Sequence, residues 1–387
     1  MFHVLTLSTL FPDITRPNFG VFVERQTLGL AALPDVDLRV VAPIGMPPFP
    51  LNRLDRYRTR DAAPLREVWK GLRVDRPRFT NIPGTAGRFH AGALYRSLLP
   101  LLTDLRRDFP FEVIDAEFFF PDGPAAVALG AHFGVPVSIK ARGADIHHWG
   151  RGATARQVLH AGQTADGLLA VSEAMRNDIA ALGIPAAKIA VHRTGIDRNH
   201  FHPRASGKAR RGVAGPLILS VGALIERKGH AIVIDAVARL PGTTLFIAGD
   251  GPDRAKLEAQ IATLNLGERV TLLGAVPHSD LPALFAAADV MALASASEGL
   301  ANVWVEALAS GTPIVITGAG GARETVDRPA AGRIVERTPE AFAHAIAELL
   351  LALPKPADVV AAADRFSWDT NASELRAHLG RLVAARD

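Results

Sequence analysis

Short runs of apolar residues alternate along this chain with longer segments that have a helical pattern. Five such runs in the first half have the length of a strand: residues 4–7, 38–42, 113–116, 136–140 and 167–171. Continuous apolar runs are typical of parallel strands that are buried on both faces of a sheet. Helical patterns separate them, at residues 22–33 and again from about Gly123. The sequence therefore predicts βαβ units and an α/β fold.

The same alternation resumes after a polar, basic segment rich in glycine and proline, residues 198–216. Strands are expected at 217–221, 244–248, 270–273, 290–293 and 313–316, and helices at 229–240, 254–264, 281–288 and 302–309. A chain of 387 residues exceeds what one hydrophobic core usually serves. We therefore expect two doubly wound domains, residues 1–200 and 216–365, with a linker at 201–215 and a tail at 366–387.

The composition excludes several classes of protein and of site. Hydrophobic residues make up 48% and charged residues 21% of the chain, the balance of an ordinary soluble globular protein. Without cysteine the chain has no disulfide, no thiolate nucleophile and no zinc site built on cysteine. No apolar run reaches the roughly 20 residues of a membrane helix, and residues 1–10 lack the basic start of a secretion signal. These features predict a cytoplasmic protein that does not span a bilayer.

Arginine-rich segments at 53–78, at 204–211 and in the tail give the chain a pI near 9.7. They form either a solvated basic surface or one that attracts an anionic partner, such as a phosphate-bearing substrate or the lipids of the inner membrane face. Nucleic acid is disfavoured, because no nucleic-acid-binding motif accompanies the charge. The aromatic and basic residues 69–90 either shape an acceptor site, rest on a membrane or form a surface insertion.

The loops that follow the strands of the second domain carry its candidate ligand-binding residues, because doubly wound sheets bind ligands at the carboxyl ends of their strands. The first loop contains Gly222 and places Arg227 and Lys228 at the entrance of a helix. A positive pair at a helix N-terminus predicts a clamp for a diphosphate. The next strand is followed by the sequence GDGP, in which Gly249 and Gly251 allow a tight turn against a ligand.

Two carboxylates mark the loop and helix that follow the expected strand at 290–293. Glu298 lies in the loop, and Glu306 lies about one turn inside the helix. Because sugar and ribose hydroxyls both favour carboxylate acceptors, this spacing predicts one carboxylate beside each. The amides of Leu300, Ala301 and Asn302 at the helix start are suited to phosphate. The alternative is that Glu298 caps a helix and Glu306 is a surface residue.

Together these motifs resemble the family 4 glycosyltransferases of the GT-B fold, and the likeness extends over nearly the whole chain. They are the two glutamates with seven residues between them, the RKG at 227–229 and the GDGP at 249–252. In the first domain the likeness rests on NFGVFVER at 18–25, FPDG at 120–123, ARGADI at 141–146 and TGID at 194–197. The resemblance implies two Rossmann-like domains that face each other across a cleft, and a closing helix at 366–387 that packs back toward the first domain.

The resemblance also implies roles for single residues of the second domain. Lys228 would bind the donor diphosphate, Glu298 the hydroxyls of the donor sugar and Glu306 the ribose. Gly299 and the three residues after it, through residue 302, would line the donor pocket. The donor would be a UDP- or GDP-sugar, and the acceptor a glycan or a lipid-linked sugar in polysaccharide or glycolipid synthesis.

In the first domain, Gly20 would bring its amide to the donor phosphate. Two positions depart from the family pattern. Ala223 stands where many members carry arginine, so either Arg227 compensates or the phosphate is bound more weakly. Arg142 stands where many members carry a histidine before Gly-x-Asp, and either Arg142 or Asp145 would then replace its contact with the donor sugar.

Neither a metal nor another cofactor is expected in the reaction. The Asp-x-Asp sequence at 35–37, a pattern that could bind a metal, falls at the entrance of a strand and not in a loop suited to that role. The leaving nucleotide diphosphate would instead be stabilised by Lys228, Arg227, the Gly20 amide and helix N-termini. The resemblance implies retention of the anomeric configuration through an oxocarbenium-like transition state. A leaving phosphate oxygen would then deprotonate the acceptor.

Two other functions would use a similar donor site. A sugar-nucleotide epimerase of the GT-B fold needs no acceptor, so nucleotide release that depends on an acceptor distinguishes the transferase. A non-catalytic sugar-nucleotide-binding protein would bind the donor without turnover. A dehydrogenase is disfavoured, because the GAGGAR at 318–323 lacks a third glycine and does not open the first βα unit.

Overall fold

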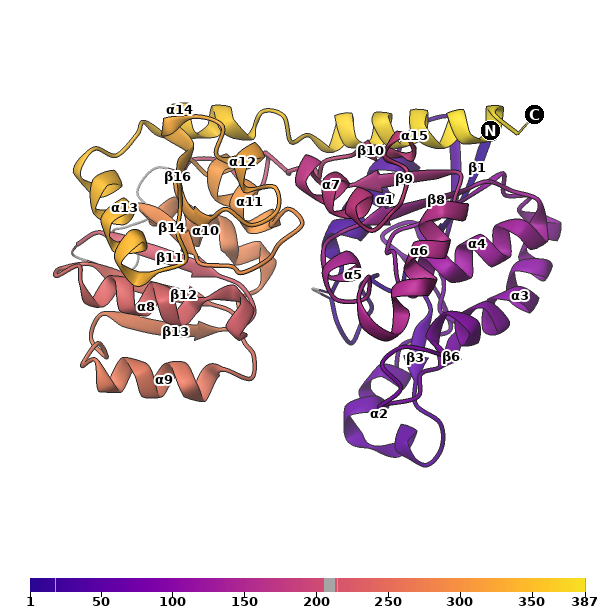
Figure 1. Cartoon of the computed structure of the whole chain (residues 1–387), viewed down its shortest axis with the longest axis horizontal. Helices are drawn as coiled ribbons and strands as arrows, with labels where there is room; N and C mark the ends of the chain where they lie inside the picture. Colours follow the sequence, from indigo (N-terminus) through magenta and orange to yellow (C-terminus); the bar gives the residue numbers. More distant parts are fainter. Residues whose placement is uncertain (18, 205–212, 214, 387) are drawn as a thin grey trace. The chain divides into compact units, whose positions relative to one another are not determined.

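The structure is a computed structural model that describes residues 1–17, 19–204, 213 and 215–386. It divides the chain into two compact units (Figure 1). The N-terminal unit contains Met1–Gly195 and the tail from Trp368 onward, and the C-terminal unit contains Ile196–Ser367. The first division thus falls after Gly195 instead of in the expected linker at 201–215, most of which lies outside the described residues.

An eight-stranded sheet forms the centre of the N-terminal unit, in the order β10-β9-β8-β7-β1-β2-β5-β4. Its strands are β1 (Phe2–Leu7), β2 (Val36–Val41), β4 (Arg66–Trp69), β5 (Leu72–Asp75), β7 (Val113–Ala116), β8 (Val137–Ala141), β9 (Gly167–Ala170) and β10 (Ile189–Val191). Neighbouring strands are parallel except for the antiparallel hairpin of β4 and β5 at one edge. A short parallel pair, β3 (Ile44–Met46) and β6 (Arg78–Thr80), lies outside this sheet.

Helices pack around this sheet as the βαβ pattern predicts. They are α1 (Val21–Ala31), α2 (Asp55–Asp61), α3 (His90–Asp108), α4 (Asp122–Phe133), α5 (Ala144–His147), α6 (Ala155–Thr164), α7 (Glu173–Ala181) and α15 (Trp368–Ala384). Along the chain α15 comes last, yet it packs against α1 and against β7 and β8 (Figure 1). The central strands are buried throughout, which explains why their sequences are continuous apolar runs.

The C-terminal unit is a six-stranded parallel sheet in the order β13-β12-β11-β14-β15-β16. Its strands are β11 (Leu217–Val221), β12 (Thr244–Ala248), β13 (Val270–Gly274), β14 (Val290–Leu293), β15 (Ile314–Thr317) and β16 (Gly332–Val335). Its helices are α8 (His230–Ala238), α9 (Arg254–Thr263), α10 (Leu281–Ala287), α11 (Asn302–Ala309), α12 (Ala322–Thr325), α13 (Pro339–Leu351) and α14 (Pro356–Val360). Side chains of alternating residues of β11 and β14 enter two separate core clusters, so the sheet is covered on both faces. The predicted pair of doubly wound α/β units is confirmed.

Helix α15 contributes to the core of the N-terminal unit. Leu375 and Leu379 are buried in one cluster with Phe2 and Val113. On the same helix the ring of His378 lies 3.1 Å from the hydroxyl of Ser138, a residue of β8. Among the described residues, no helix is both long enough and apolar enough to cross a bilayer.

Replacing Leu379 with alanine is expected to destabilise the N-terminal unit by about 2–5 kcal/mol, because a buried leucine leaves a cavity when it is truncated. Urea unfolding followed by circular dichroism measures the loss. Arg381→Ala, a change at an exposed position of the same helix, is the control and should alter the free energy of unfolding by less than about 0.5 kcal/mol. Equal effects of the two changes would contradict a core role for α15.

Candidate active site

The candidate site of the C-terminal unit begins with the loop that follows β11. Residues 226–228 form one 3-10 turn that ends at Gly229, whose φ is 70°. A Cβ at Gly229 would lie 2.2 Å from the carbonyl oxygen of Ala294, so only glycine fits this position. The amide of Ala296 also donates to the carbonyl of Arg227 over 2.8 Å. The first loop is therefore fastened to the loop that follows β14.

This packing brings Lys228 and Glu298 together across 70 residues of sequence. The Lys228 ammonium donates to Oε1 of Glu298 over 2.6 Å, and the Arg227 guanidinium lies 3.5 Å from the same oxygen. The Lys228 and Glu298 side chains are only 14% and 9% exposed. Two cations and one carboxylate thus meet at the carboxyl edge of the sheet, where ligands of such sheets bind. The two cations suit a diphosphate, and the carboxylate can accept a hydrogen bond from a sugar hydroxyl.

The glycines of the first two loops are explained by close packing between those loops. Gly249 has φ 152°, and a Cβ there would lie 1.9 Å from the carbonyl oxygen of Gly222. A Cβ at Gly251 would lie 2.5 Å from the carbonyl oxygen of Leu224. A Cβ at Gly222, whose φ is 158°, would have the Lys228 side chain as its nearest neighbour, at 3.5 Å. Contact of these three glycines with a donor stays a prediction.

The backbone around Gly299 is supported by the loop that follows β15. The amide of Gly321 donates to the carbonyl of Gly299 over 2.8 Å, and a Cβ at Gly320 would lie 2.2 Å from the Glu298 carbonyl. Leu300 follows, and α11 begins at Asn302 after Ala301, which makes no side-chain cap. The Glu298 carboxylate instead contacts Lys228 and Arg227. The first amides of a helix lack intrahelical partners, so those of α11 remain suited to an anion.

Glu306 lies inside α11 and is only 7% exposed, which rules out the alternative of a surface residue. Its Oε1 is 3.0 Å from Nε2 of His278. Its Oε2 is buried without a hydrogen-bond partner among the described residues. A buried carboxylate oxygen normally has a partner, and a ligand hydroxyl would supply one. His278 has no recognisable motif around it, so sequence reasoning did not identify it.

In the N-terminal unit, Gly20 begins α1 in the left-handed conformation, with φ 72°. A Cβ at Gly20 would lie 2.2 Å from the carbonyl oxygen of Leu10, so the loop after β1 also requires glycine here. Asn18, the first residue of this motif, lies outside the described residues. The contact of the Gly20 amide with a donor phosphate stays a prediction.

Arg142 and Asp145 are both engaged with the protein. The Arg142 guanidinium forms an ion pair with the buried carboxylate of Glu117, and its Nε donates to the Glu117 carbonyl over 2.9 Å. Asp145 has no exposed surface and accepts hydrogen bonds from the amides of Phe119 and Gly143, over 3.0 and 2.7 Å. Burial raises the pKa of Asp145. This geometry favours a positioning role for both residues, and their contact with a donor sugar stays a prediction.

His230 lies beneath the first loop at the start of α8. Its Nδ1 is 3.0 Å from the hydroxyl of Ser220, and the ring is 3.7 Å from a Cβ built on Gly222. Burial lowers the pKa of His230 to about 4. The ring is therefore neutral near pH 7 and acts as a polar support for the loop.

We expect His230 to make the free energy of unfolding of the C-terminal unit depend on pH in the acidic range. Its folded pKa of about 4 lies below the ordinary 6.5, so the unfolded chain alone binds this proton between those values. The stabilisation by the neutral His230 ring is complete above pH 6.5. On the order of 2–3 kcal/mol of it is lost as the pH falls to 4. In urea unfolding from pH 4 to 7, His230→Gln should flatten this slope. His344→Gln, a change at an exposed histidine of α13, should leave it unchanged, and equal slopes in all three proteins would contradict the prediction.

Known proteins resemble both units. Residues 204–366 match the glycosyl transferases group 1 and residues 19–195 match the glycosyl transferase 4-like domain. A Mycobacterium tuberculosis GDP-mannose-dependent alpha-(1-6)-phosphatidylinositol monomannoside mannosyltransferase is 31% identical over 62% of this chain and 68% of its own length. A Bacillus subtilis protein whose name assigns it to teichuronic acid biosynthesis is 28% identical over 89% of this chain and 88% of its own length.

Solved structures show the same fold. Sucrose-phosphate synthase from Thermosynechococcus elongatus has a TM-score of 0.80 at 20% identity, over 99% of this chain and 100% of that one. Anabaena HepE in complex with UDP-glucose has a TM-score of 0.69 at 23% identity, over 98% of this chain and 99% of that one. The solved structures show that the chain has the GT-B fold. The family matches to both units and the mannosyltransferase relative show that the chain belongs to the group 1, family 4 glycosyltransferases.

Proposed function

We propose that this enzyme transfers a sugar from a UDP- or GDP-sugar to a hydroxyl acceptor, with retention of the anomeric configuration and without a metal ion. The observation that carries the proposal is the meeting of Lys228, Arg227 and Glu298 at the carboxyl edge of the C-terminal sheet. This set offers positive charge for a diphosphate and a carboxylate for sugar hydroxyls. We place the reaction in the synthesis of a polysaccharide, a glycan or a glycolipid.

In this proposal the protein's main contribution is to stabilise the leaving group. When the bond between sugar and phosphate breaks, negative charge develops on the nucleotide diphosphate, and Lys228 and Arg227 lie where they can neutralise it. Glu298 is then free to accept hydrogen bonds from the sugar, and the unpartnered oxygen of Glu306 accepts one from the ribose. A departing phosphate oxygen takes the proton of the acceptor hydroxyl, on the face from which the leaving group departs.

The names of similar proteins support this choice of donors and of pathway. The mycobacterial relative is GDP-mannose-dependent, and structures of Anabaena HepE contain UDP or UDP-glucose. The name of the Bacillus relative assigns it to the biosynthesis of teichuronic acid. These are properties of those proteins, and they define the donor panel with which this enzyme should be tested.

A thermal-shift screen of UDP- and GDP-sugars tests donor binding, followed by assays of nucleotide release with and without glycan acceptors. We expect stabilisation by one nucleotide class, release that depends on an acceptor, full activity in EDTA and a product of unchanged anomeric configuration by NMR. Turnover of the donor without any acceptor would favour an epimerase. Binding without turnover against every acceptor would favour a sugar-nucleotide-binding protein, and an inverted product would overturn retention.

We place the enzyme in the cytoplasm, with peripheral contact to the inner face of the membrane. The exposed apolar side chains of residues 49–89 favour this contact. Phe49, Val68 and Phe89 are 68%, 71% and 58% exposed, and Arg88 and Arg96 line a surface pocket beside Phe89. Apolar side chains flanked by arginines suit an anionic lipid surface. We expect the protein to sediment with phosphatidylglycerol vesicles but not with phosphatidylcholine vesicles, and less so in high salt. Salt-insensitive or absent sedimentation would contradict this contact.

A further inference from the structure

A pocket of about 230 Å³ lies in the N-terminal unit at the carboxyl ends of three adjacent strands. Thr9 and Leu10 follow β1, Pro43 follows β2, and Phe118 and Phe120 follow β7. This edge is where a doubly wound sheet binds ligands. Because the volume lies below the roughly 300 Å³ at which sites for drug-sized ligands begin, the pocket suits a single sugar unit.

One wall of the pocket is aromatic. The rings of Phe120 and Trp149 lie 5.1 Å apart at an interplanar angle of 31°, and His90 lies 6.4 Å from Phe120 and 6.2 Å from Trp149. Trp149 and His90 are partly exposed toward the pocket that they line. A pyranose ring presents an apolar face of C–H groups, and such faces pack on aromatic rings. The hydroxyls around the ring then need hydrogen-bonding groups, and Asn81 and His90 line the same pocket.

The charged groups that line this pocket are all basic. Two arginines, Arg16 and Arg60, and one histidine line it, and its described lining contains no carboxylate. Arg16 is neutralised by Asp13, whose carboxylate it contacts over 2.8 and 3.2 Å. Arg60 comes from α2 and has no carboxylate partner among the described residues. Burial lowers the pKa of His90, so this ring provides hydrogen bonds near pH 7 and Arg60 provides the charge.

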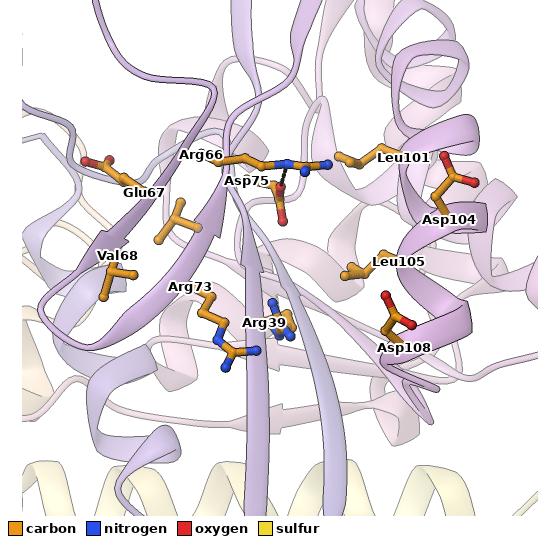
Figure 2. Close-up of a pocket in the computed structure, with 11 residues that line it drawn as sticks. Arg39, Arg66, Glu67, Val68, Arg73, Asp75, Leu101, Asp104, Leu105 and Asp108 are labelled. Carbon is orange, nitrogen blue, oxygen red and sulfur yellow. Dashed lines mark hydrogen bonds and ion pairs between the residues drawn. The ribbon is translucent and has the colours of Figure 1, made fainter.

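A larger pocket of the same unit differs from this one in the charges of its lining residues. It has a volume of about 480 Å³ and lies between the β4–β5 hairpin and α3 (Figure 2). Arginines of the strands face Asp104 and Asp108 of the helix, and Arg66 donates to Asp75 over 2.9 Å (Figure 2). Side chains of both charge signs thus line this pocket, whereas the charged side chains that line the smaller pocket are basic.

We propose that the smaller pocket binds the acceptor through a pyranose unit that carries an anionic substituent, either a carboxylate or a phosphate. The sugar ring packs on Trp149, whose ring lies against the fully buried Phe120, and the anion pairs with Arg60. This inference rests on the proposed transferase function, because it identifies the pocket with the acceptor site. The pocket also adjoins the loop of Gly20: Phe19 and Leu10 line it, and Gly20 packs on the Leu10 carbonyl.

Binding measurements with three small sugars test the proposal directly. Methyl β-D-glucuronide carries a carboxylate, glucose 6-phosphate carries a phosphate, and methyl β-D-glucoside is the neutral control. In NMR titrations we expect at least one of the charged sugars to bind about tenfold more tightly than the neutral one, as for a hydrogen bond to a charged group. Comparison of the two charged sugars shows which anion the pocket selects.

Two substitutions on one helix provide the matched pair. Arg60→Gln should lower the affinity for the preferred charged sugar about tenfold and leave that for the neutral sugar unchanged. Arg58→Gln changes an arginine of the same helix that is 73% exposed, pairs with Asp55 and does not line the pocket. It should alter neither affinity. Trp149→Ala should weaken the binding of all three sugars, with circular dichroism to confirm that the variant is folded.

The outcomes separate this inference from the proposed function. Equal affinities for charged and neutral sugars, or equal effects of Arg60→Gln and Arg58→Gln, would overturn the inference. If none of the three sugars binds while a nucleotide sugar still stabilises the protein, the inference fails and the transferase function stands. A charged sugar could still bind through Arg60 when no nucleotide sugar binds or turns over. In that case the transferase function fails, and so does the identification of the pocket with an acceptor site. The preference of the pocket for an anionic sugar would stand.

Discussion

Replacing Lys228 with alanine is expected to lower kcat/KM for the nucleotide sugar on the order of 100- to 1000-fold, because one charge-stabilising group for the leaving diphosphate is lost. The ammonium lies 2.6 Å from Glu298, so the same change also leaves that carboxylate without its closest partner. Glu298→Gln separates the two effects, because it removes the carboxylate charge and keeps Lys228. Steady-state nucleotide release with saturating acceptor provides the measurement.

The matched control for Lys228→Ala is an ion pair of the same unit away from the candidate site. Arg239 and Glu340 form such a pair, with side chains 47% and 66% exposed. Glu340→Ala should leave kcat/KM within a factor of about two, because exposed pairs contribute little. Thermal unfolding should show that all variants are folded. Full activity of both Lys228→Ala and Glu298→Gln would refute the site assignment.

Glu117→Ala is expected to destabilise the N-terminal unit by about 3–5 kcal/mol, the usual cost of removing one partner from a buried ion pair. Glu117 has no exposed surface, and it pairs with the guanidinium of Arg142. Burial alone would raise the pKa of Glu117, but the charges of Arg142 and Lys140 hold it below its ordinary value. Lys140 is also fully buried, and its ammonium lies 2.7 Å from Nδ1 of His192. Without Glu117 the Arg142 guanidinium loses its ion-pair partner, and Lys140 loses one of the negative charges that act on it.

An exposed ion pair of the same unit is the control for this prediction. Asp104 and Arg107 lie 3.3 Å apart with side chains 73% and 75% exposed. Asp104→Ala should change the free energy of unfolding by less than about 1 kcal/mol in urea titrations. Glu117→Gln, which keeps the shape and a hydrogen-bonding oxygen, should cost less than Glu117→Ala. A cost for Glu117→Ala no greater than that for Asp104→Ala would contradict the role of this buried network.

The buried strands were predictable because their burial determines their composition. The strands at 113–116, 217–221, 244–248 and 290–293 have the bounds expected from their apolar runs. The β4–β5 hairpin gave no such signal. It stands at the sheet edge, where Arg66, Val68 and Arg73 are exposed, Val68 to 71%. Its turn places Lys70 and Gly71 at positive φ, a conformation that sequence reasoning did not identify.

At the candidate site the residue types were predictable and their partners were not. The contact of Lys228 with Glu298 depends on the packing of Gly229 against Ala294, which only the fold reveals. The pairing of Arg142 with Glu117 was predictable from the sequence. Charged residues stand at the ends of two apolar strands, β7 and β8, and the ends of adjacent parallel strands meet. An arginine there favours a buried ion pair with a carboxylate at the end of the adjacent strand.

The position of α15 affects how the protein folds as it is synthesised. Residues 1–195 leave the ribosome first, but their core includes Leu375 and Leu379 from the last helix. The unit that begins first along the chain therefore cannot complete its core until residues 368–384 have been translated. The C-terminal unit, continuous from 196 to 367, can close earlier. Nascent chains halted before α15 should thus expose an apolar face on α1 and the sheet, to which chaperones bind.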